Sequence, residues 1–199
     1  MPRAFNEHER QEIKNKLQKT AEYFLLHQSM SKISIDDLVK EANIAKGTFY
    51  SFYENKELLF YDVFRIRHDA IQDEFLRQVK RVGPDINAKK LTNIIFDLFK
   101  TLDETFILKM ASRGDLERLM RKIPESLIAD HMERDQLSMQ QLFTALPQVA
   151  HQNVHVFSGA FRLALVSIMH KKDIGEDVFE DALYLVIYGI ILQMMKEKS

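Results

Sequence analysis

The sequence lacks several features that would point to stapled or metal-supported folds. It has no cysteine among 199 residues, which excludes disulfides, thiol catalysis and cysteine-ligated zinc ribbons. Prolines number four and glycines six, while 46% of the residues are hydrophobic. A chain of this length and composition can bury a sizeable core without a metal or a disulfide.

The sequence also lacks segments that would send the protein to or through a membrane. The N-terminal stretch MPRAFNEHER has no apolar core of a signal peptide. The longest apolar run covers residues 182–195, which is shorter than the ~20 residues that a membrane-spanning helix needs. We therefore expect a cytoplasmic protein without membrane contact, and we interpret this run as a buried helix.

Local motifs of catalysis are missing as well. The sequence has no glycine-rich phosphate loop, no nucleophile elbow and no metalloprotease helix motif. His151 and His155 have the i, i+4 spacing that can bind one metal ion, but no third ligand follows nearby. We expect no enzyme, no cofactor and no metal site.

The most informative stretch is Ser34–Lys56, which predicts two short helices joined by a tight turn. Ser34 and Asp37 form a potential capping box, and Asn43 tolerates the left-handed conformation that a sharp turn needs. A second helix beginning near Ala45 offers cationic, hydroxyl and phenol groups on one face, with Phe49 pointing inward. Such a helix can enter the major groove of DNA.

The segment IAKGTFYSFYENKELL resembles the signature of the TetR/AcrR repressors, within a match over residues 9 to 64. Ala45 and Asn43 stand where that family usually has serine and glycine. The resemblance implies an all-α fold in which residues 1–56 form a helix-turn-helix DNA-binding domain and residues 57–199 a helical effector-binding and dimerisation domain. The positions that we predict to contact DNA are Ser34, Ala45, Lys46, Gly47, Thr48, Tyr50, Ser51, Phe52 and Lys56.

The charge of the chain does not indicate a general polyanion binder. The net charge is −1, and residues 1–60 contain nine Lys or Arg and nine Asp or Glu. A site-specific protein can nevertheless concentrate a few cations on one face. We expect a double-stranded operator, palindromic if the protein is a dimer.

Hydrophobic spacing predicts further helices at about residues 9–28, 56–80, 86–108, 116–121, 125–144, 152–171 and 177–198. The last of these is apolar almost all round, so we expect a second subunit to cover part of it. The residues that we predict for a homodimer interface are Phe157, Phe161, Leu165, Leu183, Ile187, Ile191 and Met194.

Aromatic and methionine side chains are numerous beyond the first 60 residues and favour a site for a small apolar or amphipathic effector. Arg162 stands within an apolar segment, where a guanidinium needs a carboxylate or an anionic ligand. The predicted ligand positions are Phe64, His68, Ile71, Phe96, Phe99, Met110, Met139, Phe143 and Arg162.

The function that follows is a ligand-responsive DNA-binding regulator, which the resemblance implies to be a repressor released from its operator by the effector. Two alternatives remain open. One is a transcriptional activator of the same fold. The other is a helical ligand-binding or adaptor protein that does not bind DNA.

Overall fold

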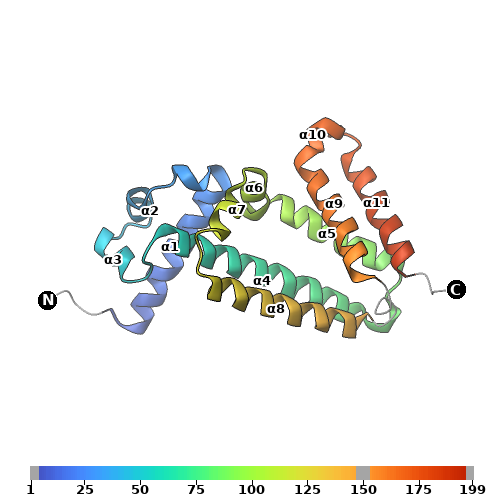
Figure 1. Cartoon of the computed structure of the whole chain (residues 1–199), viewed down its shortest axis with the longest axis horizontal. Coiled ribbons are helices and arrows are strands. Elements are labelled where there is room, and N and C mark those ends of the chain that lie inside the picture. Colours follow the sequence, from blue (N-terminus) through green and yellow to red (C-terminus); the bar gives the residue numbers. More distant parts are fainter. Residues whose placement is uncertain (1–4, 147–152, 196–199) are drawn as a thin grey trace. The chain divides into compact units, whose positions relative to one another are not determined.

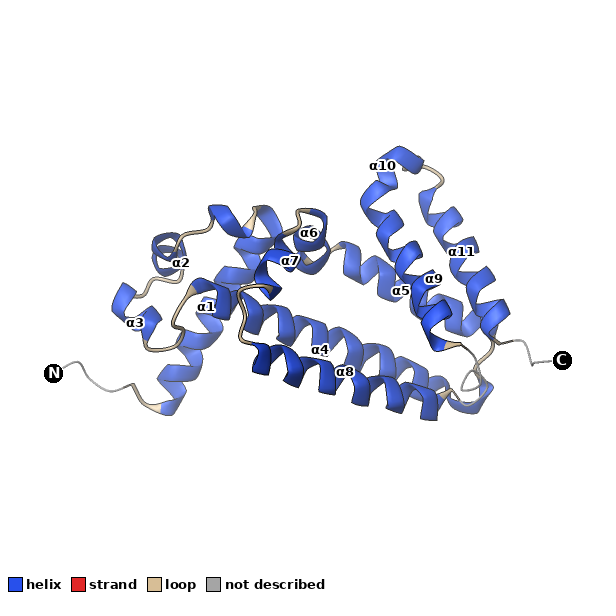
Figure 2. Cartoon of the chain, in the orientation of Figure 1, coloured by secondary structure: helices blue, strands red, loops and turns tan. Residues whose placement is uncertain are grey.

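A computed structural model describes residues 5–146 and 153–195, with the backbone alone at positions 84, 138, 139, 143 and 154. Helices, joined by turns, make up nearly all of these residues, and no strand occurs among them (Figures 1 and 2). This confirms the predicted all-α class. The chain divides into two compact units.

Unit 1 comprises residues 1–68 and 105–131. It contains the first part of α4 and the beginning of α8, together with α1 (Glu7–His27), η1 (Met30–Lys32), α2 (Ile35–Glu41), α3 (Lys46–Tyr50), α6 (Phe106–Ser112) and α7 (Asp115–Met120). The helix α4 covers Lys56–Val82 and α8 covers Glu125–Ala145, so both continue into unit 2.

The core of unit 1 joins the N-terminal helices to a segment from the middle of the chain. Leu17, Leu38 and Phe49 are fully buried there, together with Phe106 and Met110 of α6. The segment 105–131 therefore completes the N-terminal core. The domain boundary that we predict between residues 56 and 57 leaves the segment 105–131 out of the N-terminal domain. That boundary stays a prediction about which residues form the DNA-binding domain.

Unit 2 comprises residues 69–104 and 132–199. It contains the remainder of α4 and α8 together with η2 (Gly83–Asp85), α5 (Ala88–Asp103), α9 (Val154–Ser167), η4 (Ile168–His170), α10 (Lys171–Ile174) and α11 (Phe179–Met194). The C-terminal helix α11 packs against α5 and α9. Within this unit α8 is joined to α4 by side-chain hydrogen bonds from Gln72 to Asp135 and from Lys80 to Gln141.

One predicted helix is wrong. We expected a single helix over residues 86–108, but the chain breaks at Glu104 and Thr105 into α5 and α6. The buried residues of α5 pack in unit 2, whereas Phe106 and Met110 pack in unit 1. The break allows consecutive stretches of sequence to contribute to different cores.

The remaining long helices agree with the spacing of the sequence. The helix α1 begins with a capping box in which Asn6 and Glu9 exchange side-chain and backbone hydrogen bonds. The helix α4 begins at Lys56, after Asn55 accepts the amide hydrogen of Leu58. Among the described residues, no helix combines the length and apolar character needed to cross a membrane.

Candidate functional site

The first helix of the predicted helix-turn-helix begins as the sequence indicates. The Ser34 hydroxyl oxygen accepts the Asp37 amide at 3.1 Å, while the Asp37 carboxylate accepts the Ser34 amide at 3.0 Å. The Ser34 hydroxyl also donates to Asp37, and this bond lowers the pKa of the Asp37 carboxyl group. The capping box fixes where α2 starts, and it places Ser34 on the surface.

The turn after α2 is a Schellman motif built on Asn43. The φ angle of Asn43 is 51°, so this residue takes the left-handed conformation predicted for it. The Asn43 amide donates to the Lys40 carbonyl, and the Ile44 amide donates to the Val39 carbonyl at 3.0 Å. These bonds satisfy carbonyls at the end of α2 and set the direction in which the chain enters α3.

The second helix of the motif, α3, has an inner and an outer face. Phe49 is fully buried, whereas Lys46 and Gly47 are exposed and the Tyr50 side chain is 51% exposed. Nothing lies within 4 Å of the position that a Cβ atom would occupy at Gly47. The outer face therefore presents a cation, bare backbone and a phenol, which are the groups that can meet bases and phosphates.

Other predicted contact positions flank this face. Ala45 is exposed and makes no side-chain cap for α3, while Thr48 is half-buried. The Ser51 hydroxyl donates to the Thr48 carbonyl at 2.7 Å. Phe52 is half-buried with the Arg10 guanidinium 4.9 Å from its ring centre, so Arg10 is a cation beside the motif that the sequence analysis did not identify.

Lys46 forms an ion pair in this structure. Its ammonium lies 2.8 Å from the Asp36 carboxylate, and both side chains are exposed. The hydrogen bond to Asp36, together with the attraction of that charge, raises the pKa of Lys46. An exposed pair of this kind contributes little to stability and can exchange for a phosphate or a base.

Lys56 has a structural partner that the sequence analysis did not foresee. Its ammonium donates to the carbonyls of Met30 at 3.2 Å and Ile33 at 2.6 Å, and the side chain is half-buried. The sequence predicts that Lys56 contacts DNA. The structure shows that it joins the start of α4 to the loop that precedes α2.

A buried carboxylate also binds the loop that precedes α2. Asp115 begins α7 and is fully buried. It accepts the Ser29 hydroxyl at 2.8 Å, the Met30 amide at 2.9 Å and the Arg118 guanidinium at 3.0 Å. The entry to α2 is thus fixed by α4 and by α7 together. Only the fold reveals this role, since Asp115 stands far from the motif in sequence.

A third group of polar contacts joins α4 to α1 and to the end of the helix-turn-helix. The buried Tyr53 hydroxyl donates to Asp62 at 2.7 Å, and Gln18 of α1 donates to the same carboxylate oxygen at 2.9 Å. Burial first, and then this hydrogen bond, raise the pKa of Tyr53. Burial alone would raise the pKa of the Asp62 carboxyl group. Hydrogen bonds from Tyr53, Gln18 and Arg65 have the opposite effect and outweigh burial, so the pKa of Asp62 is lowered.

The predicted ligand positions do not all come together. Phe64 and Met110 are buried in the core of unit 1. Arg162 is exposed on α9 rather than buried, which corrects the expectation of an internal guanidinium. Met139, Phe143 and His151 lie outside the residues whose side chains the structure describes.

Two of the predicted ligand positions line a hollow in unit 2. Phe96 and Phe99 of α5 border it together with Ile168, Phe179 and Leu183, and its volume is about 180 Å³. Charged side chains stand at the same hollow: Lys100, Asp103, Glu104, Lys171 and Glu180. The Lys100 ammonium donates to Glu180 at 3.0 Å, and this bond lowers the pKa of the Glu180 carboxyl group.

The predicted dimer residues of α11 face the interior. Leu183, Ile187, Ile191 and Met194 are buried within the subunit, because this face of α11 packs in unit 2. They are therefore core residues and not the surface that we expected. The exposed apolar residues are on other faces: Val156, Leu163, Val166 and Met169 of α9 and η4, and Leu185, Val186 and Leu192 of α11. Phe157, Phe161 and Leu165 are half-buried.

No family model matches the chain, and no curated protein sequence is significantly similar to it. Solved structures do share its architecture. A TetR transcriptional regulator from Rhodococcus sp. RHA1 has 12% identity and a TM-score of 0.47, over 92% of this chain and 97% of that one. Thermus thermophilus FadR, a TetR-family transcriptional repressor in complex with lauroyl-CoA, has 15% identity and a TM-score of 0.52, over 94% of this chain and 96% of that one.

The second of these likenesses covers both units and almost the whole of each chain. At 15% identity it concerns the backbone arrangement. The arrangement agrees with the helix-turn-helix described above, in which α2, the Asn43 turn and α3 follow one another. The chain therefore has the fold of the TetR-family transcriptional regulators.

Proposed function

We propose that the protein is a sequence-specific DNA-binding transcriptional regulator that responds to a small ligand and acts in the cytoplasm. The observation that carries the proposal is the geometry of α2, the Asn43 turn and α3. The turn directs α3 so that Phe49 is buried while Lys46, Gly47 and Tyr50 are exposed. A short helix with these exposed groups fits the major groove.

Each exposed group of α3 has a distinct proposed role. Lys46 and Thr48 lie near base edges, where the ammonium of Lys46 donates to guanine acceptors. Tyr50 contacts a base edge or a phosphate. Gly47 allows the backbone to approach the DNA closely, since its surroundings are open. In the complex Lys46 exchanges its bond with Asp36 for the DNA.

We propose that the protein binds DNA as a homodimer on a palindromic operator. The apolar surface of α9 and α11 supports this, because Leu163 is 76% and Leu185 is 67% exposed. Side chains of this size in such numbers on neighbouring helices are typical of a protein–protein interface. A two-fold dimer presents two copies of α3, and these fit half-sites one turn of DNA apart, about 34 to 36 Å.

The effector that we propose is a small apolar or amphipathic molecule. The hollow in unit 2 combines the apolar side chains of Phe96, Phe99 and Phe179 with charged groups of both signs, two lysines and three carboxylates. Its volume of about 180 Å³ accommodates a small molecule or one end of a longer chain. Thermus thermophilus FadR, which has a similar fold, was solved in complex with lauroyl-CoA.

Helix α4 offers a route from the effector to the DNA. It contributes residues to both units. Its first residue, Lys56, donates hydrogen bonds to the loop before α2. A ligand that displaces α4 would therefore change the position of α3. A ~100-fold preference of the effector for the displaced state, about 2.7 kcal/mol, is enough for a clear response. Reciprocity requires that operator DNA weaken effector binding by the same factor.

A gel shift with genomic fragments, followed by sequencing of the bound DNA, tests the proposal. We expect the recovered fragments to share an inverted repeat, and Tyr50→Ala to abolish their selective recovery. Tyr23→Ala is a matched control, since Tyr23 is also an exposed tyrosine of unit 1 but lies on α1. Failure of the wild-type protein to retain any fragment at low salt would favour a helical adaptor without DNA binding.

The direction of regulation needs a separate experiment. We propose repression, in which the bound dimer blocks a promoter until the effector releases it. A reporter gene behind the recovered operator should become active when the gene for this protein is deleted. Loss of reporter activity on deletion would instead identify an activator of the same fold.

A further inference from the structure

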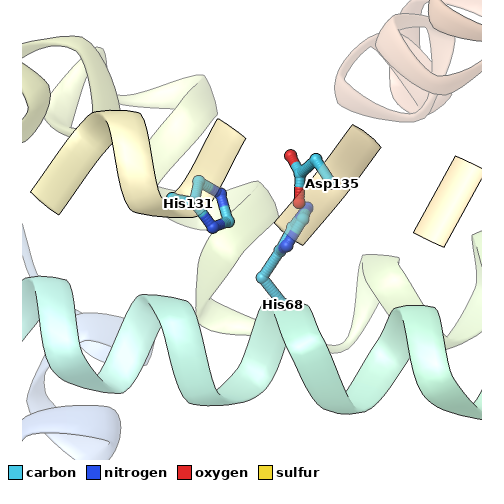
Figure 3. A group of neighbouring side chains, drawn as sticks. All are labelled: His68, His131 and Asp135. Atoms are coloured by element: carbon cyan, nitrogen blue, oxygen red, sulfur yellow. The ribbon is translucent and has the colours of Figure 1, made fainter. Parts of the chain in front are cut away.

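Three side chains that commonly bind metal ions lie together on α4 and α8. His68 belongs to α4, and His131 and Asp135 belong to α8. One ligand atom from each lies within 4.8 Å of the others, and Figure 3 shows the side chains pointing toward one another. His131 and Asp135 are four residues apart, so α8 itself places both on one face.

The two imidazole rings are held by aromatic neighbours within unit 1. Their centres are 4.8 Å apart with an angle of 70° between the planes. The ring of Phe64 stacks on His68 at 5.6 Å and lies 5.6 Å from His131, and Tyr61 lies 6.5 Å from His131. His131 is only 9% exposed. Packing on these rings reduces the access of water to both histidines.

The carboxylate is oriented by a neighbour that is not itself a ligand. Gln72 of α4 donates through its side-chain nitrogen to Oδ1 of Asp135 at 3.1 Å. Outer hydrogen bonds of this kind fix the orientation of metal-binding carboxylates and are part of a metal site in proteins.

We propose that His68, His131 and Asp135 bind one divalent transition-metal ion of the zinc class. Two imidazole nitrogens and one carboxylate oxygen suit Zn²⁺ and its neighbours better than Mg²⁺ or Ca²⁺, which prefer oxygen ligands. Three protein ligands leave a fourth tetrahedral position for water or for a small molecule.

The geometry is close to that of a bound state. Bonds of 2.0–2.1 Å in a tetrahedral site place ligand atoms about 3.3 Å apart. The ligand atoms of His68, His131 and Asp135 lie within 4.8 Å of one another, which exceeds the separation in a bound site by at most about 1.5 Å. Rotation of the side chains about their χ angles can close this gap. The helices need not be rebuilt.

Titration with Co²⁺, which reports tetrahedral nitrogen and oxygen ligation through its visible absorption, tests the site in the full chain without DNA. We expect one Co²⁺ per chain and its displacement by Zn²⁺. His68→Gln and Asp135→Asn should each lower the affinity by more than ~100-fold, because each removes a direct ligand. Gln72→Leu should lower it ~10- to 100-fold through the orientation of Asp135.

Two surface histidines give matched controls. His170 lies 3.1 Å from the Asp173 carboxylate but both side chains are exposed, and His155 is exposed on α9. His170→Gln and His155→Gln should leave Co²⁺ binding unchanged. An absence of Co²⁺ absorption in the wild-type protein would overturn the proposal, as would equal affinity in His68→Gln and the wild type. Because DNA is absent from the assay, its result is distinct from that of the operator experiment.

Discussion

The buried carboxylate of Asp115 gives a prediction whose size follows from its contacts. It accepts hydrogen bonds from Ser29, Met30 and Arg118, and it is 0% exposed. Arg118 is half exposed, so solvent screens its share of the interaction. The bonds to the Ser29 hydroxyl and the Met30 amide are internal, and they hold the loop that leads into α2.

Asp115→Asn keeps the shape of the side chain but replaces one acceptor oxygen by a donor. One of the two internal hydrogen bonds is then lost, and each bond to a charged group is worth ~1.5–3 kcal/mol. The donor left unsatisfied inside the protein costs a further ~1–3 kcal/mol. We therefore expect a loss of ~3 kcal/mol or more, which is a fall in Tm of about 6–12 °C for a chain of this size.

Thermal and urea unfolding measure this loss, and fluorescence anisotropy measures operator binding below the transition. Asp173→Asn is the control, because Asp173 also accepts from a nearby side chain but is exposed. The control should change Tm by less than ~2 °C. If Asp115→Asn behaved like the control, the carboxylate would not anchor the loop, and the argument from buried hydrogen bonds would be refuted.

Four further predictions concern the surfaces and the α1–α4 contact. Lys46→Ala should weaken operator binding about 5- to 150-fold and relax the preference at one base pair; unchanged anisotropy would remove Lys46 from the interface. Asp36→Asn should tighten binding to all sequences, because it releases Lys46 and removes a negative charge beside α3; weaker binding would contradict this. Leu185→Glu should shift sedimentation from dimer to folded monomer, while Ile187→Glu should unfold the subunit; a wild-type monomer at micromolar concentration would exclude the interface. The pKa of Asp62 is lowered in the folded protein, so its contribution to stability is present above about pH 4 and is lost as the pH falls below that value. Tyr53→Phe should make this loss of stability in acid smaller, and identical stability–pH profiles for the variant and the wild type would contradict the assignment.

Features set by neighbours in sequence were predicted correctly. The Ser34–Asp37 capping box, the left-handed Asn43 and the start of α4 at Lys56 all depend on hydrogen bonds within a few residues. Phe49 points inward because the turn and the helical period together determine its direction. The core of the candidate DNA site could thus be read from the local pattern.

Features set by contacts across the chain could not be predicted in this way. The helix α11 is apolar almost all round, so its period does not say which side is buried, and we assigned Ile187 to the wrong face. Lys56 and Asp115 both form hydrogen bonds with the loop before α2, and this loop is far from each of them in sequence. His68 meets His131 only because α4 and α8 pack together.

Selection of genomic DNA by the purified protein is the direct test of sequence reading by α3. The wild-type protein and Lys46→Ala should be compared at the same salt concentration, since phosphate contacts make affinity depend on salt. We predict that the wild type enriches fragments with one shared inverted repeat, whose half-sites are centred 10–10.5 base pairs or a multiple of that apart. Lys46→Ala should enrich them less and with a relaxed base preference. Enrichment of no common sequence, or equal enrichment by both proteins, would contradict DNA reading by α3.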